Sequence, residues 1–525
     1  MYNQLRDKGS IMTEQTTAPR RLHVILLTIF ASMALVARLL PGARIVDDAF
    51  ITFRYARNIV NGLGFVYNPG ERVLGTTTPL YTLILAALSL ATGSQDFPSI
   101  AFMLNAVAGT ASVGMLYLLG VQISDHWAPA AAAAALWALA PYSVTFATGG
   151  METELCIMLL LACTYAHITR RCCWLSILSA MALLTRPDTA ILLGLLWFDE
   201  LLIRRGIPWR QAILAIALML PWILFGTLYY GSPLPGSIAA KSATYRLPPE
   251  AGLVRLVQHY STPAFEHNLL GPRWQLLGSF VYLAICAFGG LHTVKQNTRS
   301  WPIFLYPYVY LIVFAAANPL IFRWYLSPPL PFYLLSITTS LWVLLHLLST
   351  ALVRRPSIRI QETIANVTFV VLTAAAGFST LNSWTIHPDH GLDRPAPDMA
   401  WYELELLYNR AADILLEITS PDDSLCAGDI GVLGYRTGLH IIDTVGLVTP
   451  AARDYYPADT SLYAINYAIP PDLILDLAPD KIVILEVYGR LGLIPNPQFK
   501  MQYELTHKLD TDIYGSDGML IFSRR

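Results

Sequence analysis

The chain has 525 residues and a formal net charge of −1, and 54% of its residues are hydrophobic while only 14% are charged. Its mean hydropathy is +0.48. Soluble globular proteins carry about a quarter charged residues, so the composition excludes an ordinary soluble protein and indicates an integral membrane protein. The near-neutral charge gives no sign of nucleic-acid binding.

The N-terminal residues 1–21 are polar, and Arg20-Arg21 precede the first apolar segment. We expect a cytoplasmic tail followed by an uncleaved anchor, because no small-residue cleavage site follows. A membrane-spanning helix needs about 20 mostly apolar residues. The clear candidates are 22–40, 99–121, 128–147, 152–169, 212–230, 273–293, 302–320, 329–352 and 363–384.

Hydropathy alone does not show how two apolar stretches cross the membrane, and the distribution of basic residues is needed to interpret them. Residues 79–92 are short, and residues 174–203 form one long run interrupted by Arg186-Pro187-Asp188. Basic loops face the cytoplasm, which favours 79–92 lying along the outer interface and 174–203 forming two short spans. The basic clusters used are Arg20-Arg21, Arg170-Arg171, Arg204-Arg205 with Arg210, Lys295 with Arg299, and Arg354-Arg355 with Arg359.

This threading predicts a multi-pass protein of the cell membrane with about eleven spans, a cytoplasmic N-terminus and an outer C-terminus. The inner connections are short and basic, whereas the outer connections are longer and polar, so we expect function on the outer face. The outer segments are 41–98, 148–152, 185–189, 231–272 and 320–328.

Residues 385–525 are polar and contain no span-length apolar run. We predict strands at 481–486 and 439–443 and an amphipathic helix at 400–418, hence a small extracytoplasmic α/β domain. The predicted organisation is a transmembrane module over 1–384, with a long first outer loop, and this domain over 385–525.

The acidic pair Asp47-Asp48 directly follows the first span and opens a helical segment, 47–60. Phe50, Phe53 and Arg57 share one side of that helix, which predicts a helix lying at the membrane interface, and Arg54 is spaced to pair with the acids. The acids suit a helix N-terminus. A carboxylate in a water-restricted cleft is equally suited to act as a general base.

Two cations are candidate phosphate ligands on the same outer face. Lys241 follows the loop Pro233-Leu234-Pro235, and Arg323 lies among aromatic residues. Both side chains suit a phosphate, and both also suit the membrane interface, where such side chains reach the headgroups. Three further charges interrupt apolar segments and are candidate supporting residues, although they also suit a helix terminus or a self-neutralising kink: Glu152, Arg186 and Asp188.

These segments together resemble the GT-C membrane glycosyltransferases, and the strings are closer to the mycobacterial terminal arabinofuranosyltransferase type and related uncharacterised bacterial proteins. The resemblance covers nearly the whole chain. Its strings are DDAFITFRYARNIVNGLGFVYNPGERVLG (47–75), Gly150-Met-Glu-Thr153, Thr185-Arg-Pro-Asp188, Pro233-Leu-Pro235 with Lys241, and Gly428-Asp-Ile-Gly431 to Gly446-Leu447. The family often has Pro-Asn-Thr in the lysine loop, where this chain has Pro235-Gly236-Ser237.

The resemblance implies transfer of a sugar from a polyprenyl-phosphate donor to an acceptor hydroxyl at the outer face, with inversion at the anomeric carbon. Asp47 is then the first choice for the general base and Asp48 orients it or the acceptor. Lys241 and Arg323 stabilise the departing phosphate, and Arg54, Arg57, Glu152, Arg186 and Asp188 support the site. We expect no cofactor. Two adjacent carboxylates are able to hold Mg²⁺ or Mn²⁺, but no further acids cluster near them.

Two other functions fit a polytopic chain. A transporter or flippase of lipid-linked glycans often has internal repeats, and none is visible here. A non-catalytic glycan-binding protein would tolerate loss of Asp47 and Asp48. The sugar stays open among arabinofuranose, mannose and other pentoses or hexoses, and the acceptor among glycan, lipid and protein.

Overall fold

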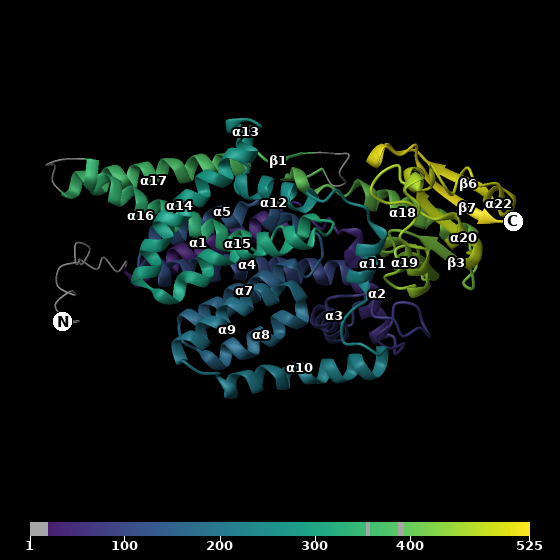
Figure 1. The fold of residues 1–525 in the computed structure, drawn as a ribbon, viewed down its shortest axis with the longest axis horizontal. Coiled ribbons are helices and arrows are strands. Elements are labelled where there is room, and N and C mark those ends of the chain that lie inside the picture. Colours follow the sequence, from purple (N-terminus) through teal and green to yellow (C-terminus); the bar gives the residue numbers. More distant parts are fainter. Residues whose placement is uncertain (1–18, 353–357, 387–392) are drawn as a thin grey trace.

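The computed structural model describes residues 19–352, 358–386 and 393–525. Residues 1–18 of the predicted tail 1–21 and the basic pair Arg354-Arg355 lie outside the described residues. Helices form one end of the molecule, and a small sheet with its own helices forms the other end (Figure 1). The predicted class, a helical membrane protein followed by an α/β domain, is confirmed.

The predicted spans each coincide with a helix or a pair of helices. They are α1 (Arg20–Leu39), α4 (Phe97–Ser124), α5 (Trp127–Leu139) with α6 (Pro141–Thr148), α7 (Thr153–Ile168), α8 (Cys172–Thr185), α9 (Ala190–Arg204), α10 (Trp209–Tyr230), α14 (Trp274–Gln296), α15 (Trp301–Ala317), α16 (Leu330–Leu352) and α17 (Ile358–Leu381).

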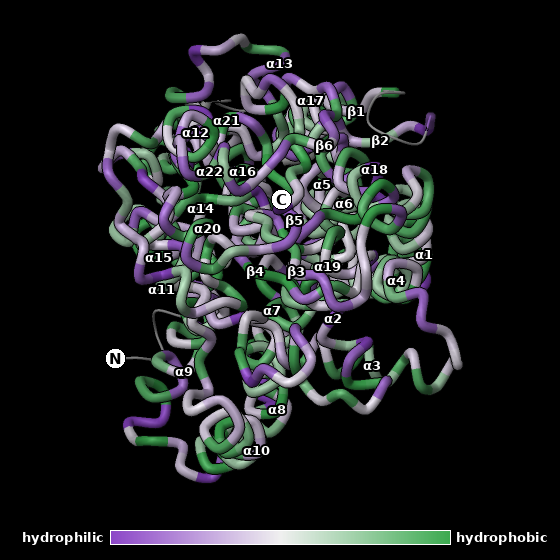
Figure 2. Tube along the Cα trace, turned by 90° about the vertical axis from the view of Figure 1, so that its right-hand side faces the viewer, coloured by the Kyte–Doolittle hydropathy of each residue, from purple (hydrophilic) through white to green (hydrophobic). Residues whose placement is uncertain are grey.

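Length and composition qualify seven helices in the described part of the chain as membrane spans, or eight when α5 and α6, bent by 47°, count as one. The helices α7 and α8 are shorter, so the total of about eleven crossings stays a prediction. Only 6% of the apolar window of α10 is buried within the protein, and the residues of this helix are mostly hydrophobic (Figure 2). Lipid is the solvent that suits such a face, and the chain is a multi-pass membrane protein.

The interruption at Arg186-Pro187-Asp188 separates two helices, as predicted. The helix α8 ends at Thr185, Arg186 is extended with φ −155°, and Pro187 opens the short 3-10 turn η1 (Pro187–Thr189) before α9. Proline lacks the amide hydrogen that would continue α8 and disfavours helical geometry in the residue before it. The break is therefore encoded locally.

The predicted outer connections fold into short helices that lie between the membrane-spanning helices in the sequence. The first connection holds α2 (Asp47–Val60) and α3 (Pro79–Thr92), and the long connection after α10 holds α11 (Ser237–Thr244), α12 (Ala251–Ser261) and α13 (His267–Leu270). A 3-10 turn, η3 (Arg323–Tyr325), precedes α16.

The C-terminal domain contains a five-stranded mixed sheet in the order β4-β3-β5-β7-β6. The strand β3 pairs in parallel with β4 and β5, while β7 is antiparallel to β5 and β6. The predictions at 481–486, 439–443 and 400–418 are confirmed as β5, β4 and α18. The elements are α18 (Glu403–Ile418), β3 (Ser424–Ala427), α19 (Gly431–Thr437), β4 (His440–Asp443), η6 (Pro450–Tyr455), α20 (Pro471–Leu477), β5 (Lys481–Leu485), α22 (Pro497–Gln502), β6 (Tyr503–Leu509) and β7 (Met519–Arg524).

The helix α2 is buried inside the protein, which corrects the prediction that it lies on the membrane surface. Its residues Ala49 to Ala56 are all buried. Phe50 and Phe53 pack on the ring of Tyr435 in α19, at centroid distances of 5.3 and 6.2 Å. The apolar side that suggested an interfacial helix contacts the C-terminal domain, because aromatic side chains are buried equally well by protein or by lipid.

The contact between α2 and α19 has no room for a side chain at Gly431. A Cβ there would lie 1.8 Å from the carbonyl oxygen of Asp47 and 2.6 Å from its carbonyl carbon. Both are main-chain atoms, so no rotation of a side chain relieves the overlap.

We predict that Gly431→Ala separates α2 from α19 and lowers the free energy of unfolding by about 3 kcal/mol, as expected for an overpacked buried contact. Thermal denaturation of the detergent-solubilised chain measures the change. Gly194→Ala in α9 is the matched control, because a Cβ there meets no atom within 4 Å. Equal stability of the two variants would contradict the prediction.

The predicted orientation can be read from a native cysteine. Cys173 is exposed and follows the basic pair Arg170-Arg171. We expect a membrane-impermeant maleimide to label it only after cells are permeabilised, and to label Lys500→Cys in the exposed part of α22 in intact cells. Labelling of Cys173 in intact cells would contradict the predicted threading.

Candidate active site

The candidate site lies where α2, α11 and the C-terminal domain meet. The Asp48 carboxylate and the Lys241 ammonium are 3.6 Å apart, and their side chains are 28% and 24% exposed, so both remain reachable by a ligand. The ammonium of Lys241 also lies 4.7 Å from the centroid of the Phe322 ring. Sequence analysis placed these two charges on one face, and the structure brings them into contact.

Burial alone would lower the pKa of Lys241, but the nearby Asp48, Tyr325 and Asp429 outweigh it and raise the pKa above its usual value. Lys241 therefore remains a cation at neutral pH. This partly exposed ammonium is able to stabilise the negative charge of a ligand that binds close to it.

Asp47 is committed to the protein main chain. Its two carboxylate oxygens accept hydrogen bonds from the amides of Gly431 (2.9 Å) and Val432 (2.7 Å), the first residues of α19. Burial raises the pKa of Asp47, the neighbouring Asp429 raises it further, and the hydrogen bond from Val432 opposes them. The carboxylate links the first outer loop to the C-terminal domain.

Asp429 is a third carboxylate of this site, which sequence analysis did not single out. It follows β3 in the glycine-flanked turn before α19, and Oδ2 accepts a hydrogen bond of 2.5 Å from the Tyr408 hydroxyl. Burial raises the pKa of Asp429, and Asp48 adds to the rise while Lys241 opposes it. Its signal is an acid at the carboxyl end of β3, where α/β domains commonly bind ligands, but that strand was not predicted from the sequence.

Glu405 lies on the buried side of α18 beneath the acidic pair. Its Oε1 accepts a hydrogen bond of 3.2 Å from the amide of Asp47, and its Oε2 is buried without a partner. Burial is the main cause that raises the pKa of Glu405 to about 7. The anchoring of α2 therefore includes a carboxyl that changes its protonation near neutral pH.

Arg54 and Arg57 hold α2 against the C-terminal domain rather than pairing with Asp47 or Asp48. The guanidinium of Arg54 is 1% exposed and donates to the carbonyls of Tyr67, Gly434 and Leu439 at 2.7–2.9 Å. Arg57 donates to the carbonyl of Tyr435 at 2.8 Å. The predicted Arg54 ion pair is wrong, because a buried guanidinium needs an acceptor for each of its N–H groups, and main-chain carbonyls supply them.

Arg323 contacts the start of the C-terminal domain. Its Nη1 donates a hydrogen bond of 2.6 Å to the carbonyl of Met399. The side chain is half-buried. No direct contact joins it to Asp48 or Lys241 in the described part of the chain, so its predicted contact with a phosphate stays a prediction.

Glu152, Arg186 and Asp188 form one ion cluster. Arg186 makes two hydrogen bonds of 2.9 Å with the carboxylate of Asp188, and its Nη1 lies 3.5 Å from Glu152. The Tyr310 hydroxyl donates to Asp188 at 3.1 Å. The geometry matches the self-neutralising kink, with Glu152 as an added partner, and the cluster joins the α8–α9 break to the start of α7.

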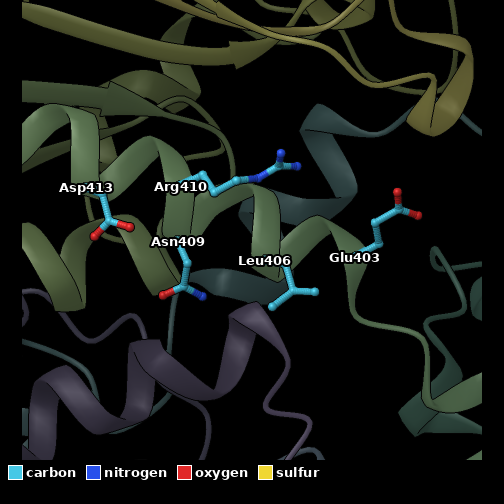
Figure 3. Close-up of a pocket in the computed structure, with 5 residues that line it drawn as sticks. All are labelled: Glu403, Leu406, Asn409, Arg410 and Asp413. Carbon is cyan, nitrogen blue, oxygen red and sulfur yellow. The ribbon is translucent and has the colours of Figure 1, made fainter. Parts of the chain in front are cut away.

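A separate open groove of about 460 Å³ runs along the outer side of α18 (Figure 3). Its residues recur at helical spacing on a face other than the one that carries Glu405 and Tyr408, and Asp413 pairs with Arg436 at 2.7 Å. Across the described ranges, no group of three or more histidine, cysteine, aspartate or glutamate side chains is arranged to hold a metal ion. The groove is lined by Glu403, Leu406, Asn409, Arg410 and Asp413.

The arrangement of the whole chain is shared with solved membrane glycosyltransferases. ArnT from Cupriavidus metallidurans, in a crystal structure bound to undecaprenyl phosphate, superposes with a TM-score of 0.55 at 10% identity, over 96% of this chain and 98% of that one. The chain has the GT-C fold. The oligosaccharyltransferase of Archaeoglobus fulgidus, tethered to an acceptor peptide, gives a TM-score of 0.53 at 11% identity, over 96% of this chain and 74% of that one.

Sequence comparisons agree with the resemblance stated above. The terminal β-(1→2)-arabinofuranosyltransferase of Mycobacterium tuberculosis (strain ATCC 25618 / H37Rv) is 26% identical over 228 residues, which cover 38% of this chain. The match spans about a third (35%) of the length of that relative. Residues 398–522 match a domain of unknown function (DUF8728).

We predict that Glu405→Gln, compared with the parent protein, is more stabilising at pH 8 than at pH 5. Because burial raises the pKa of Glu405 from 4.5 to about 7, the native state favours the protonated form of this side chain. The free energy of unfolding of the parent protein therefore falls as pH rises through that interval. Glutamine cannot ionise and still accepts the Asp47 amide. The melting temperature of the variant, relative to the parent, should rise by about 2 °C or more from pH 5 to pH 8.

The matched control is Glu417→Gln, which removes a carboxylate from the exposed side of the same helix. A melting-temperature difference for Glu405→Gln that is the same at both pH values would sink the assignment of Glu405 as a buried titrating group.

Proposed function

We propose that the chain is a membrane glycosyltransferase that moves a sugar from a polyprenyl-phosphate donor to an acceptor hydroxyl at the outer face of the membrane, with inversion. The observation that carries the proposal is the contact of 3.6 Å between Asp48 and Lys241, which joins a base and a cation from two distant segments. The GT-C fold, the undecaprenyl phosphate bound to ArnT and the arabinofuranosyltransferase relative support it.

Asp48, in preference to Asp47, is the proposed general base. Both oxygens of Asp47 already accept main-chain N–H groups, so protonating it would break an anchoring hydrogen bond. Asp48 is more exposed and its only ion-pair partner in the described structure is Lys241. The sequence favoured Asp47 because it comes first after the span, and main-chain contacts from α19 reverse that order.

The proposed reaction needs one proton acceptor and one cation. Asp48 takes the proton of the acceptor hydroxyl while the oxygen of that hydroxyl forms a bond to the anomeric carbon. The bond between that carbon and the phosphate oxygen breaks, and its electron pair leaves with the lipid phosphate. Lys241 stabilises the phosphate, which is stable as an anion and needs no proton. Attack opposite the leaving group inverts the anomeric carbon.

Asp429 has a defined part in this proposal. Asp48 lies near enough to contribute to the raised pKa of Asp429, because two nearby carboxylates repel each other. Tyr408 holds Asp429 in place through the 2.5 Å hydrogen bond. The C-terminal domain thereby contributes a second carboxyl group near the proposed base.

Replacing Asp48 with asparagine should lower sugar transfer by about 10²–10⁴-fold, the usual contribution of a general base. Purified protein is assayed with polyprenyl-phosphate donors carrying labelled arabinofuranose or mannose. Asp47→Asn is the comparison, and we expect it mainly to lower thermal stability. A folded Asp48→Asn variant that transfers sugar as fast as the parent would refute the assignment and favour the non-catalytic alternative.

A further inference from the structure

Arg453, in η6 of the C-terminal domain, extends its side chain across two glycines. A Cβ on Gly446 would lie 2.7 Å from Cγ of Arg453, and a Cβ on Gly236 would lie 2.4 Å from Nη2 and 2.7 Å from Nη1. Gly446 belongs to the loop after β4, and Gly236 immediately precedes α11. The absence of both side chains is what lets one arginine cross from the domain to the lysine loop.

The end of this arginine has unused donors. Its Nε donates a hydrogen bond of 2.9 Å to the carbonyl of Gly446. In the part of the chain that the structure describes, Nη1 and Nη2 have neither a hydrogen-bond acceptor nor a carboxylate partner, and the side chain is half-buried. A guanidinium with a free planar edge is suited to grip a phosphate through two parallel hydrogen bonds.

The start of α11 offers a second set of donors beside this guanidinium. Ser237 is its first residue, only 5% exposed, and its hydroxyl is buried without a hydrogen-bond partner. Lys241 lies one turn further along the same face. Side chains of a helix tilt toward its N-terminus, so the lysine leans back toward Ser237, and the unpaired amides of the first turn add positive potential there.

We propose that Arg453, Ser237 and the first turn of α11 form a subsite next to Lys241. This subsite binds the phosphate of the polyprenyl-phosphate donor. The inference rests on the proposed function and deepens it, because it gives the C-terminal domain a part in donor binding. Gly236 leaves space in the lysine loop, and Arg453 fills that space from outside the loop.

The subsite divides the phosphate contacts between two parts of the protein. Lys241 comes from the membrane module and Arg453 from the C-terminal domain, while Arg323 is bonded to Met399. A donor phosphate bound between them would bridge the two parts. Its position close to the Asp48–Lys241 pair places the anomeric carbon beside the proposed base.

The test compares two ligands that differ only by the phosphate, farnesyl phosphate and farnesol, bound to the full-length protein in phosphatidylcholine nanodiscs. We expect the parent to prefer the phosphate. Arg453→Ala should reduce this preference about tenfold, the loss expected for one charge-assisted contact. Gly236→Ala should do the same, since its methyl group displaces Nη1 and Nη2, and Arg453→Lys should retain part of the preference.

Thr244→Val is the matched control for a purely structural role. The hydroxyl of Thr244 donates to the carbonyl of Val445 at 3.2 Å, so the variant loses another contact between α11 and the same loop while Arg453 stays in place. We expect it to keep the parent's preference. A loss equal to that of Arg453→Ala would show that Arg453 acts only by docking the domain, and would overturn the subsite.

The remaining outcomes separate this inference from the proposed function. A parent that does not distinguish farnesyl phosphate from farnesol contradicts the polyprenyl-phosphate donor itself. A parent that prefers the phosphate while Arg453→Ala and Gly236→Ala match it contradicts the subsite alone. A preference that disappears in phosphatidylglycerol nanodiscs would mean that lipid headgroups occupy the subsite, and would overturn its assignment to the donor.

Discussion

The contact on which the rest of this structure depends is the carboxylate of Asp47 bound to the first amides of α19. A buried carboxylate is costly unless its lone pairs are satisfied, and here both oxygens are. The bond fixes the start of α2 against the C-terminal domain. Since Asp48 is the next residue, about 100° around the helix, the same anchor turns its carboxylate toward Lys241. The two adjacent acids thus have different partners because their side chains point in different directions.

The candidate site is composite. The first outer loop contributes Asp48, the connection after α10 contributes Lys241, and the C-terminal domain contributes Asp429 and the proposed phosphate ligand Arg453. Glycines make the close approaches possible, at Gly431 for α2 and at Gly236 and Gly446 for Arg453. The domain that matches a family of unknown function is therefore a structural part of the site, rather than an appendage next to it.

The sequence predicted local features well and long-range contacts poorly. Hydropathy located the membrane helices, the interruption of an apolar run located the break at Arg186-Pro187-Asp188, and short β-rich stretches located β4 and β5, because each depends on neighbouring residues. The sequence also placed Asp48 and Lys241 on one side. It misassigned Arg54, because its acceptor in α19 lies 380 residues away and no local pattern records it. The hydrogen bonds of Asp47 to α19, which bear on the proposed choice of base, span a similar distance along the chain. Glu405 and Arg453 were missed for the same reason, and Asp429 was missed because the strand before it was not predicted.

The hydrogen bonds of Arg54 bear on how the protein is made. Its acceptors Gly434 and Leu439 lie 380 and 385 residues further along the chain. While the ribosome is still feeding helices into the membrane, α2 has been synthesised but its buried guanidinium and carboxylate have no partners. The candidate site is therefore incomplete in the half-built protein. It is completed in a later step of biogenesis, when the segment that carries α19, translated long after α2, packs on the first outer loop.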